Sequence, residues 1–188
     1  FQSLETPSLM IDQLDVLQHT TAWFERSISI YEFSESIQEL IHISKYKNMP
    51  GICSRYGRDI GELCIKQNLL EAVDLIAPVP LHSLRLRERG YNQAAIIAKE
   101  IAKLNSIAFD EKLLKRVRYT NQQAKYNKEE RAENVRDAFA LKKNIDITNK
   151  KIALVDDVLT TGATMNECAK ILKDNGANAV ITITIVRI

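Results

Sequence analysis

Residues 151–164 read KIALVDDVLTTGAT and form the most informative segment of this 188-residue chain. Four consecutive apolar residues predict a buried parallel strand, and two adjacent carboxylates, Asp156 and Asp157, follow at its carboxyl end. A Thr/Gly loop then leads into a predicted helix. Because ligands of open α/β sheets bind beside the carboxyl ends of the strands, this segment is the first candidate for a binding site.

The loop after the two aspartates has the composition of a phosphate site. A helix N-terminus offers free backbone N–H groups and the positive end of the helix dipole. Thr160, Thr161 and Thr164 add hydroxyl donors, and Gly162 before Ala163 allows the backbone to curl tightly around an anion. Carboxylates beside such a loop suit a ligand that also has hydroxyl groups or a bound Mg²⁺. We therefore predict a site for a sugar phosphate with vicinal hydroxyls.

A simpler explanation covers part of the same segment. Thr164 and Glu167 have the spacing of a capping box, which needs no ligand, and an Asp-Asp pair can belong to an ordinary turn. A capping box leaves unexplained why a buried strand delivers two acids next to a Thr-Thr-Gly loop. The ligand-binding interpretation is the one we favour.

Strand and helix patterns alternate through the last two thirds of the chain, which predicts an α/β fold with a parallel sheet. The predicted strands span residues 72–79, 151–155 and 179–187, and the predicted helices span residues 91–104, 127–136 and 164–175. Residues 81–90 are predicted to be a basic loop. Earlier in the chain we predict helices at residues 9–24, 36–45 and 52–67 and a strand at residues 27–33. We assign residues 1–70 to a small N-terminal lobe and residues 71–188 to the core.

The charge distribution and the motifs of the sequence limit the classes of function that fit the chain. The net charge is +2, but residues 85–136 carry thirteen Lys and Arg against seven acids. That positive segment fits a phosphate ester, a nucleic-acid backbone or simply solvated helix faces. P-loop and dinucleotide-binding motifs are absent from the sequence, and three scattered cysteines without a C-x-x-C pair exclude a zinc ribbon within these residues. We expect reduced thiols, a cytoplasmic protein and no membrane span.

Residues 152–164 resemble the thirteen-residue phosphoribosyl-diphosphate (PRPP) signature of the type I phosphoribosyltransferases. The resemblance extends to the ComF/GntX branch, the competence-protein ComF family linked to DNA uptake, and covers about residues 28–188. The further matching stretches are residues 77–82, 85–93, 116–123 and 130–135. The resemblance implies a parallel sheet flanked by helices with a small N-terminal hood. It also implies transfer of a phosphoribosyl group from PRPP, with Mg²⁺, to an acceptor, with release of pyrophosphate.

The resemblance also assigns roles to individual residues. Asp156 and Asp157 would contact the ribose hydroxyls and Mg²⁺, and residues 160–164 would hold the 5-phosphate. Residues 116–126 would form a loop that closes over the site. The remaining roles concern pyrophosphate. Its binding loop would consist of Val79, Pro80, Leu81 and His82. The arginines that would lie near the diphosphate are Arg85, Arg89, Arg116 and Arg118. The alternative to this role is that the four arginines are ordinary solvated charges on the protein surface. A cis Val79–Pro80 peptide would cost only about 0.5–1 kcal/mol.

Two departures from the family pattern limit these expectations. Family members commonly carry an N-terminal four-cysteine zinc module, which the given residues lack. We expect that it has been lost or that it precedes residue 1. Thr160 stands where the 6-oxopurine enzymes place an acid that serves the base, so hypoxanthine–guanine salvage is disfavoured. A second function stays open, that of a non-catalytic accessory of DNA uptake that binds single-stranded DNA or the competence machinery. The basic segment supports it, although no helix-turn-helix is evident.

Overall fold

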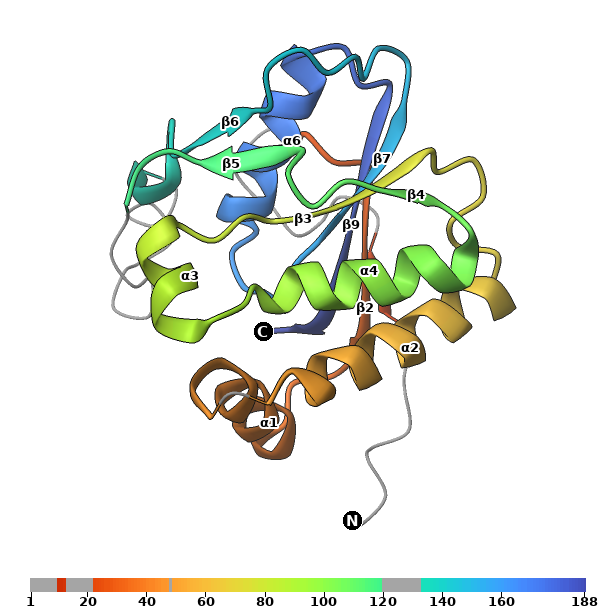
Figure 1. The fold of residues 1–188 in the computed structure, drawn as a ribbon. Helices are drawn as coiled ribbons and strands as arrows, with labels where there is room; N and C mark the ends of the chain where they lie inside the picture. Colours follow the sequence, from red (N-terminus) through yellow and green to blue (C-terminus); the bar gives the residue numbers. More distant parts are fainter. Residues whose placement is uncertain (1–9, 13–21, 48, 120–132) are drawn as a thin grey trace.

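A mainly parallel β-sheet forms the centre of the computed structural model, which describes residues 10–12, 22–47, 49–119 and 133–188 (Figure 1). Its strands are β1 (Met10–Asp12), β2 (Arg26–Tyr31), β3 (Leu75–Pro78), β4 (Ala108–Phe109), β7 (Lys151–Val155), β8 (Val158–Leu159) and β9 (Ala179–Arg187). They lie in the order β1-β2-β9-β7-β3-β4, and β8 pairs with β9. A separate antiparallel pair is formed by β5 (Leu114–Arg116) and β6 (Phe139–Leu141).

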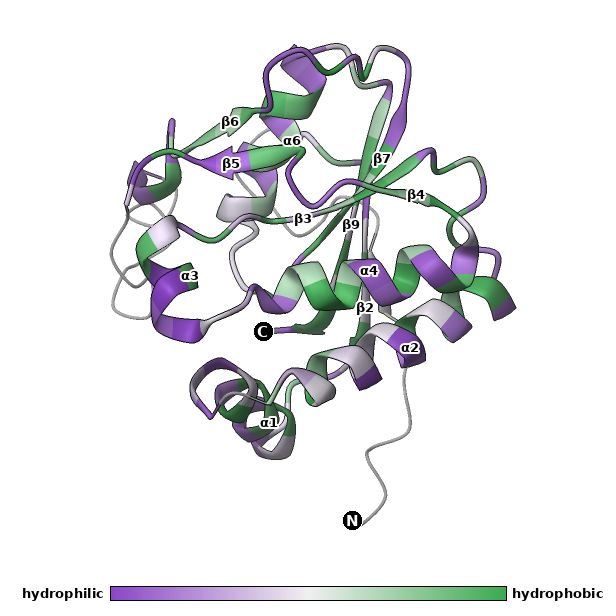
Figure 2. Cartoon of the chain, viewed as in Figure 1, coloured by the Kyte–Doolittle hydropathy of each residue, from purple (hydrophilic) through white to green (hydrophobic). Residues whose placement is uncertain are grey.

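Side chains of the central strands alternate between two hydrophobic cores. On β7, Ala153 and Val155 belong to one core, whereas Ile152 and Leu154 belong to the other. Because both of its faces are covered, β7 is a continuous apolar run rather than an alternating one. Figure 2 shows this hydrophobic colouring along β7 and β9. The predicted α/β fold with a parallel sheet flanked by helices is confirmed.

Helices cover both faces of the sheet. They are α1 (Glu35–Tyr46), α2 (Pro50–Lys66), α3 (Ser83–Arg89), α4 (Gln93–Asn105) and α6 (Ala163–Asp174). On one face α2 and α4 lie side by side, and a Cβ added at Gly57 of α2 would stand 2.7 Å from the Cβ of Glu100. This glycine therefore allows the close approach of the two helices. On the other face, α6 buries Cys168, Ala169 and Leu172. Among the described residues no helix is long and apolar enough to cross a membrane.

The first part of the chain contributes both to the sheet and to its edge. β2 pairs with β9 in parallel, so a strand of the predicted hood lies inside the sheet. α1 follows β2 and lies at the carboxyl ends of the parallel strands, where a hood is expected (Figure 1). The division of the chain into domains at residue 70 stays a prediction. The strand and helices predicted at residues 27–33, 36–45 and 52–67 correspond to β2, α1 and α2.

Two sequence predictions are wrong. Residues 10–12 of the helix predicted at residues 9–24 form β1, which pairs antiparallel with β2. This pairing covers an edge of β2 that would otherwise expose its backbone groups, an advantage that outweighs the local helical spacing. Residues 13–21 lie outside the described residues, as do residues 127–132 of the helix predicted at residues 127–136.

The second error concerns the basic segment at residues 81–90, which contains α3 rather than a loop. The imidazole Nδ1 of His82 accepts the N–H of Leu84 at 3.3 Å, and Gly90 ends the helix in the left-handed conformation. None of the α3 residues is buried, so the segment has no apolar periodicity to reveal a helix. Its two caps were the only local signals.

Candidate active site

The two adjacent aspartates lie where β7 leaves the sheet. The N–H of Asp156 donates to the carbonyl of Ile183 at 3.0 Å, and the carbonyl of Asp157 accepts the N–H of Ile185 at 3.1 Å. The N–H of Asp157 also donates to Oδ1 of Asp156 at 2.9 Å. These bonds to β9 and between the two aspartates fix the backbone of the acid pair, by which we mean Asp156 and Asp157.

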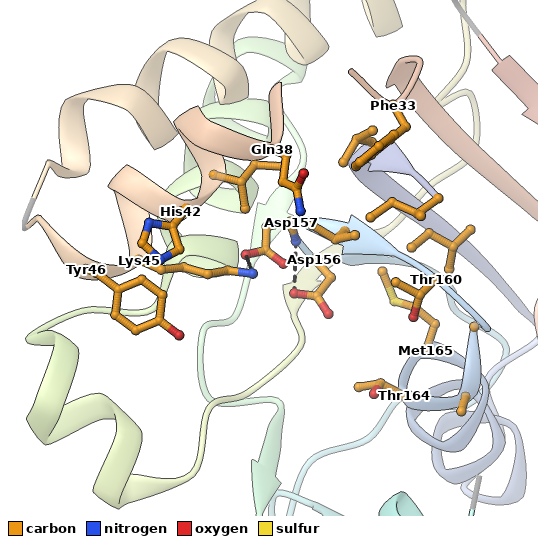
Figure 3. Close-up of a pocket in the computed structure, with 17 residues that line it drawn as sticks. Phe33, Gln38, His42, Lys45, Tyr46, Asp156, Asp157, Thr160, Thr164 and Met165 are labelled. Atoms are coloured by element: carbon orange, nitrogen blue, oxygen red, sulfur yellow. Dashed lines mark hydrogen bonds and ion pairs between the residues drawn. The ribbon is translucent and has the colours of Figure 1, made fainter. Parts of the chain in front are cut away.

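A cavity of about 470 Å³ opens beside the acid pair (Figure 3). Its walls come from α1 and Phe33 before it, from the segment between β7 and α6, and from the end of β9 with the C-terminus. The lining residues are Phe33, Gln38, Ile41, His42, Lys45, Tyr46, Asp156, Asp157, Val158, Leu159, Thr160, Gly162, Ala163, Thr164, Met165, Val186 and Ile188. The acid pair and the loop thus line one side of the cavity, and a mixture of polar, apolar and aromatic side chains lines the other.

Lys45 of α1 reaches across this cavity to the acid pair. Its Nζ lies 2.7 Å from Oδ2 of Asp157, and the two side chains are only 23% and 13% exposed. Figure 3 shows the lysine extending from its helix toward both carboxylates. No motif marks Lys45 in the sequence, and its relation to the acids exists only because the fold brings α1 to the strand ends.

The end of α1 is held in place by residues around α4. The carbonyl of Ser44 accepts a hydrogen bond from the hydroxyl of Tyr91 and another from the side-chain amide of Gln93, the latter at 3.3 Å. Arg89 lies over the ring of Tyr46 at 5.4 Å and donates to the side chain of Gln93 at 3.4 Å. These contacts fix the turn of α1 that carries Lys45.

Charge and burial shift the pKa values of the site. Burial raises the pKa of the Asp156 carboxyl to about 7, and the charge of Asp157 acts in the same direction. Burial acts to lower the pKa of Lys45, but the ion pair with Asp157 outweighs it, so the pKa lies above the ordinary value. The site therefore holds Lys45, which is stabilised as a cation, beside the carboxyl of Asp156, which resists ionisation.

The predicted phosphate loop leads directly into α6. Gly162 is the N-cap residue of α6, with φ 75° in the left-handed region that favours glycine, and it provides no side-chain cap. Thr160, Gly162, Ala163 and Thr164 line the cavity, whereas Thr161 does not, and its Oγ1 faces the N–H of Ala163 at 3.5 Å.

The alternative of a capping box at Thr164 and Glu167 does not match the start of α6, whose N-cap residue is Gly162. Helix α6 begins at Ala163, before the threonine. Glu167 instead accepts the N–H of Asp137 at 2.9 Å, so its carboxylate serves the segment before β6.

The predicted pyrophosphate loop lies at the end of β3, the strand next to β7. The N–H of Val79 donates to the carbonyl of Val155 at 2.8 Å, and the carbonyl of Val79 accepts from the side chain of Asn92 at 3.0 Å. Val79, Pro80, Leu81 and His82 do not line the cavity. The described residues contain no cis peptide bond, so Val79–Pro80 is trans.

The four predicted arginines have different contact partners, although the charges of Arg85 and Arg118 both act on Arg116. The guanidinium of Arg85 lies 5.9 Å from the ring of Tyr119, and that of Arg116 lies 5.2 Å from the ring of Phe139. Arg118 donates to the backbone carbonyls of Asn134 and Arg136. These arginines, like Arg89 beside Tyr46, lie outside the cavity lining.

Arg116 is nonetheless electrostatically linked to the acid pair. Burial lowers its pKa, while the charge of Asp156 acts to raise it again. In turn, Arg116 acts to lower the pKa of Asp156. Arg116, one of the arginines predicted to bind the diphosphate, therefore lies close enough to Asp156 for the two charges to interact. Residues 120–126 of the predicted closing loop lie outside the described residues.

Comparison with known proteins agrees with the geometry. Residues 87–187 match the protein family described as "Phosphoribosyl transferase domain". The chain is 31% identical over 170 residues to "Competence protein F" of Haemophilus influenzae, covering 87% of this chain and 73% of that protein. It is 30% identical over 167 residues to "DNA utilization protein YhgH" of Salmonella typhimurium, covering 87% and 72%. It is 28% identical over 161 residues to "Competence protein ComFC" of Bacillus subtilis, covering 85% and 63%.

The family match includes α4, β7, α6 and the whole of β9, and therefore contains the acid pair and the loop after it. The relatives named for competence extend the similarity over most of the remaining chain. The chain belongs to the phosphoribosyl transferase domain family, as a type I member of its ComF branch.

Proposed function

We propose that this protein binds PRPP or a related sugar phosphate, together with Mg²⁺, and transfers the phosphoribosyl group to an acceptor with release of pyrophosphate. The observation that carries the proposal is the position of the acid pair and the start of α6 on one cavity. The acceptor would enter from the side of α1, where the lining combines polar side chains with Phe33, Ile41 and Tyr46.

The start of α6 suits the 5-phosphate. The first N–H groups of an α-helix have no partner within the helix, and the helix dipole adds positive potential there. Gly162 provides no side-chain cap, and its left-handed backbone turns the chain into the helix. An anion between Thr160 and Thr164 would accept hydrogen bonds from these N–H groups.

The acid pair suits the ribose and a metal ion. Carboxylates accept hydrogen bonds from a vicinal diol, and Mg²⁺ in proteins is commonly bound through one or two carboxylates together with substrate phosphates. The described residues hold no group of three metal-ligating side chains, so substrate oxygens would complete the coordination. When bound, Mg²⁺ would supply positive charge that stabilises the leaving diphosphate.

The side chains of the protein would contribute to the transfer step through their positions and their charges. Asp156 and Asp157 would fix the ribose ring and stabilise the positive charge that develops on it as the bond to diphosphate breaks. Arg116 would add positive charge on the diphosphate side. Phe33 and Ile41 would exclude water, which would otherwise hydrolyse PRPP.

A thermal melt tests the proposal. A ligand at a hundredfold excess over its Kd stabilises the native state by about 2.7 kcal/mol, and 1 kcal/mol moves the midpoint of a chain of this size by roughly 2–4 °C. We expect PRPP with Mg²⁺ to raise the midpoint by about 5–11 °C. An unshifted midpoint at millimolar PRPP would refute binding, and pyrophosphate release in an acceptor screen would then test transfer.

Two variants assign the effect to the acid pair. Asp156→Asn with Asp157→Asn keeps the shape of both side chains but removes their charge, and should abolish most of the shift. Glu62→Gln, an exposed acid on α2, is the matched control and should keep it. Equal shifts in the double variant and the parent would remove the role proposed for the aspartates.

A DNA-related function is the second candidate, favoured by the surface of α3. Arg85, Arg87 and Arg89 lie on this short helix together with Leu84 and Leu86, which are 46% and 43% exposed. Figure 2 shows α3 as a mostly hydrophilic segment at the periphery. Binding of single-stranded DNA that weakens with salt and is lost when the three arginines are replaced by Gln would support this function. Binding unchanged by that replacement would exclude α3 as the contact.

A further inference from the structure

We propose that Lys45 is the resident counter-ion of the acid pair, and that a divalent cation binds there only by displacing the lysine ammonium. The inference rests on the proposed function in one respect, that the acid pair is a cation and sugar site. It adds a regulatory element to that site, because the displaced residue belongs to α1, the helix that covers the cavity.

The geometry distinguishes this contact from an ordinary surface ion pair. Nζ of Lys45 and Oδ2 of Asp157 are 2.7 Å apart, and both side chains are mostly shielded from water. Exposed lysine–carboxylate pairs contribute little because water competes for both groups. Here the ammonium replaces much of the water that would otherwise solvate Asp157, at the point where Mg²⁺ would require a carboxylate oxygen.

The position of Lys45 is imposed by the fold rather than by the flexibility of its side chain. Its neighbour Ser44 is anchored by two hydrogen bonds to its carbonyl, from Tyr91 and Gln93, and its own hydroxyl donates to the carbonyl of Ile41 at 2.8 Å. The turn of α1 therefore presents the lysine toward the acids (Figure 3). Acids and counter-ion come from different elements, so releasing one contact changes how α1 is held.

Charge makes the two cations mutually exclusive. A Mg²⁺ bound to Asp157 would lie within a few ångströms of the ammonium, where like charges repel strongly at the reduced dielectric of a partly buried site. Mg²⁺ also demands close oxygen ligands in nearly octahedral geometry, which the bonded ammonium obstructs. The ammonium must move away from Asp157 before the metal can use that carboxylate.

Titration with Mn²⁺, followed by the loss of the free-ion EPR signal and without PRPP, measures this competition. We expect Lys45→Met to bind Mn²⁺ at least tenfold more tightly than the parent, because the acid pair loses its counter-ion. Lys45→Arg restores the charge and should bind as weakly as the parent. Lys47→Met, an exposed lysine at the end of the same helix, is the matched control and should also behave as the parent.

A second readout separates displacement from a structural effect. Without divalent cations, Lys45→Met should melt below the parent, because a shielded carboxylate loses its partner, and Mn²⁺ should restore more of its midpoint than it adds to the parent's. Adding Asp157→Asn to Lys45→Met should remove the gain in Mn²⁺ affinity. If Lys45→Met does not fold, Lys45→Gln serves the same titration. Equal Mn²⁺ affinities in the parent and the neutral variant would overturn the proposal.

The outcomes also separate this inference from the proposed function. A parent protein that PRPP does not stabilise, combined with tighter Mn²⁺ binding by Lys45→Met, would refute phosphoribosyl binding and support the counter-ion role. Stabilisation of the parent by PRPP with unchanged Mn²⁺ affinity in Lys45→Met would support phosphoribosyl binding and refute the counter-ion role.

Discussion

The two walls of the cavity are built in different ways. The wall beside α6 is one continuous segment, in which a buried strand, two acids, a glycine at the N-cap and a helix follow one another. The wall beside α1 is an amphipathic helix, whose Gln38, His42, Lys45 and Tyr46 reach the cavity only through the tertiary fold. The residues of the first wall can be recognised within one short segment of the sequence. Those of the second wall come together only in the folded structure.

This difference suggests a division of labour. In the proposed function, the α6 wall would bind the groups common to every phosphoribosyl donor, namely a phosphate and a ribose diol. The α1 wall faces the region left for an acceptor and contributes Lys45 to the acid pair. If the division is real, damage to the α1 wall should change stability or cation binding while anion binding at α6 survives.

Ile41→Ala should loosen the α1 wall without affecting the phosphate site. Ile41 is 6% exposed and packs in the core beneath the helix. Truncation of a buried isoleucine costs about 2–5 kcal/mol, and we expect the lower part of this range because the residue also borders the cavity. Denaturant unfolding measures the loss, and calorimetry with inorganic phosphate should give the parent's affinity.

Glu39→Ala on the same helix is the control, since Glu39 is exposed and its loss should change the free energy of unfolding by no more than about 0.5 kcal/mol. Loss of phosphate binding in Ile41→Ala would show that the α6 wall depends on the packing of α1.

Gly162→Ala should weaken anion binding in addition to its effect on folding. Both Gly162 and Gly176, near the other end of α6, have positive φ, of 75° and 93°. An alanine at either position should cost about 1–2 kcal/mol of strain. A Cβ at Gly176 would only touch Thr148, with its nearest atom at 3.4 Å. Only the change at Gly162 should reduce the affinity for ribose 5-phosphate.

The paired measurement is calorimetric titration of both glycine variants, normalised to the folded fraction. An equal affinity of the Gly162 variant and the parent would mean that the N-cap of α6 is not the phosphate cradle.

The contrast between the walls also explains what the sequence could reveal. The strands β3, β7 and β9, the helices α4 and α6, and the position of the acids at the end of β7 follow from hydrophobic patterns within short windows. Thr160, Gly162 and Thr164 were predicted site residues and do line the cavity. Local spacing carries such information because all these groups lie on one strand–loop–helix unit.

The missed features depend on contacts between distant segments. Lys45 is an ordinary residue in the last turn of a helix, and only the pairing of β2 with β9 brings that helix to the acids. In the same way, β1 is a strand because it covers the edge of β2, although its residues fit a helical spacing. Helix α3 escaped notice because it buries nothing. The contact of Lys45 and the formation of β1 are thus decided by partners that a sequence window does not contain, whereas α3 depends on the caps at its own two ends.

The acid pair should make stability fall with rising pH. The pKa of Asp156 in the folded protein is about 7, above its ordinary value of 3.8, because burial disfavours the charged form. Between these values the folded state binds more protons than the unfolded state, so the free energy of unfolding decreases as pH rises. This contribution is complete below the unfolded pKa and is lost as pH passes through about 7. Asp156→Asn should flatten the dependence in melts between pH 5 and 8.

A control for this pH effect is Asp174→Asn, which removes an exposed acid of α6 and should keep the parent's slope. An unchanged slope in Asp156→Asn would show that another group governs the pH dependence.

Tyr46→Ala should have the smallest effect and gives the sharpest test of the division between the walls. The ring is 56% exposed, lies 4.6 Å from that of His42 and has the guanidinium of Arg89 5.4 Å from its centre. An exposed cation–π contact is worth about 0.5–1 kcal/mol, so the melting midpoint should fall by only a few degrees at most. If the sugar phosphate is held by the α6 wall alone, the shift caused by PRPP with Mg²⁺ should equal the parent's. A shift reduced as far as in the double aspartate variant would mean that α1 also holds the donor, and the walls would then act as one site.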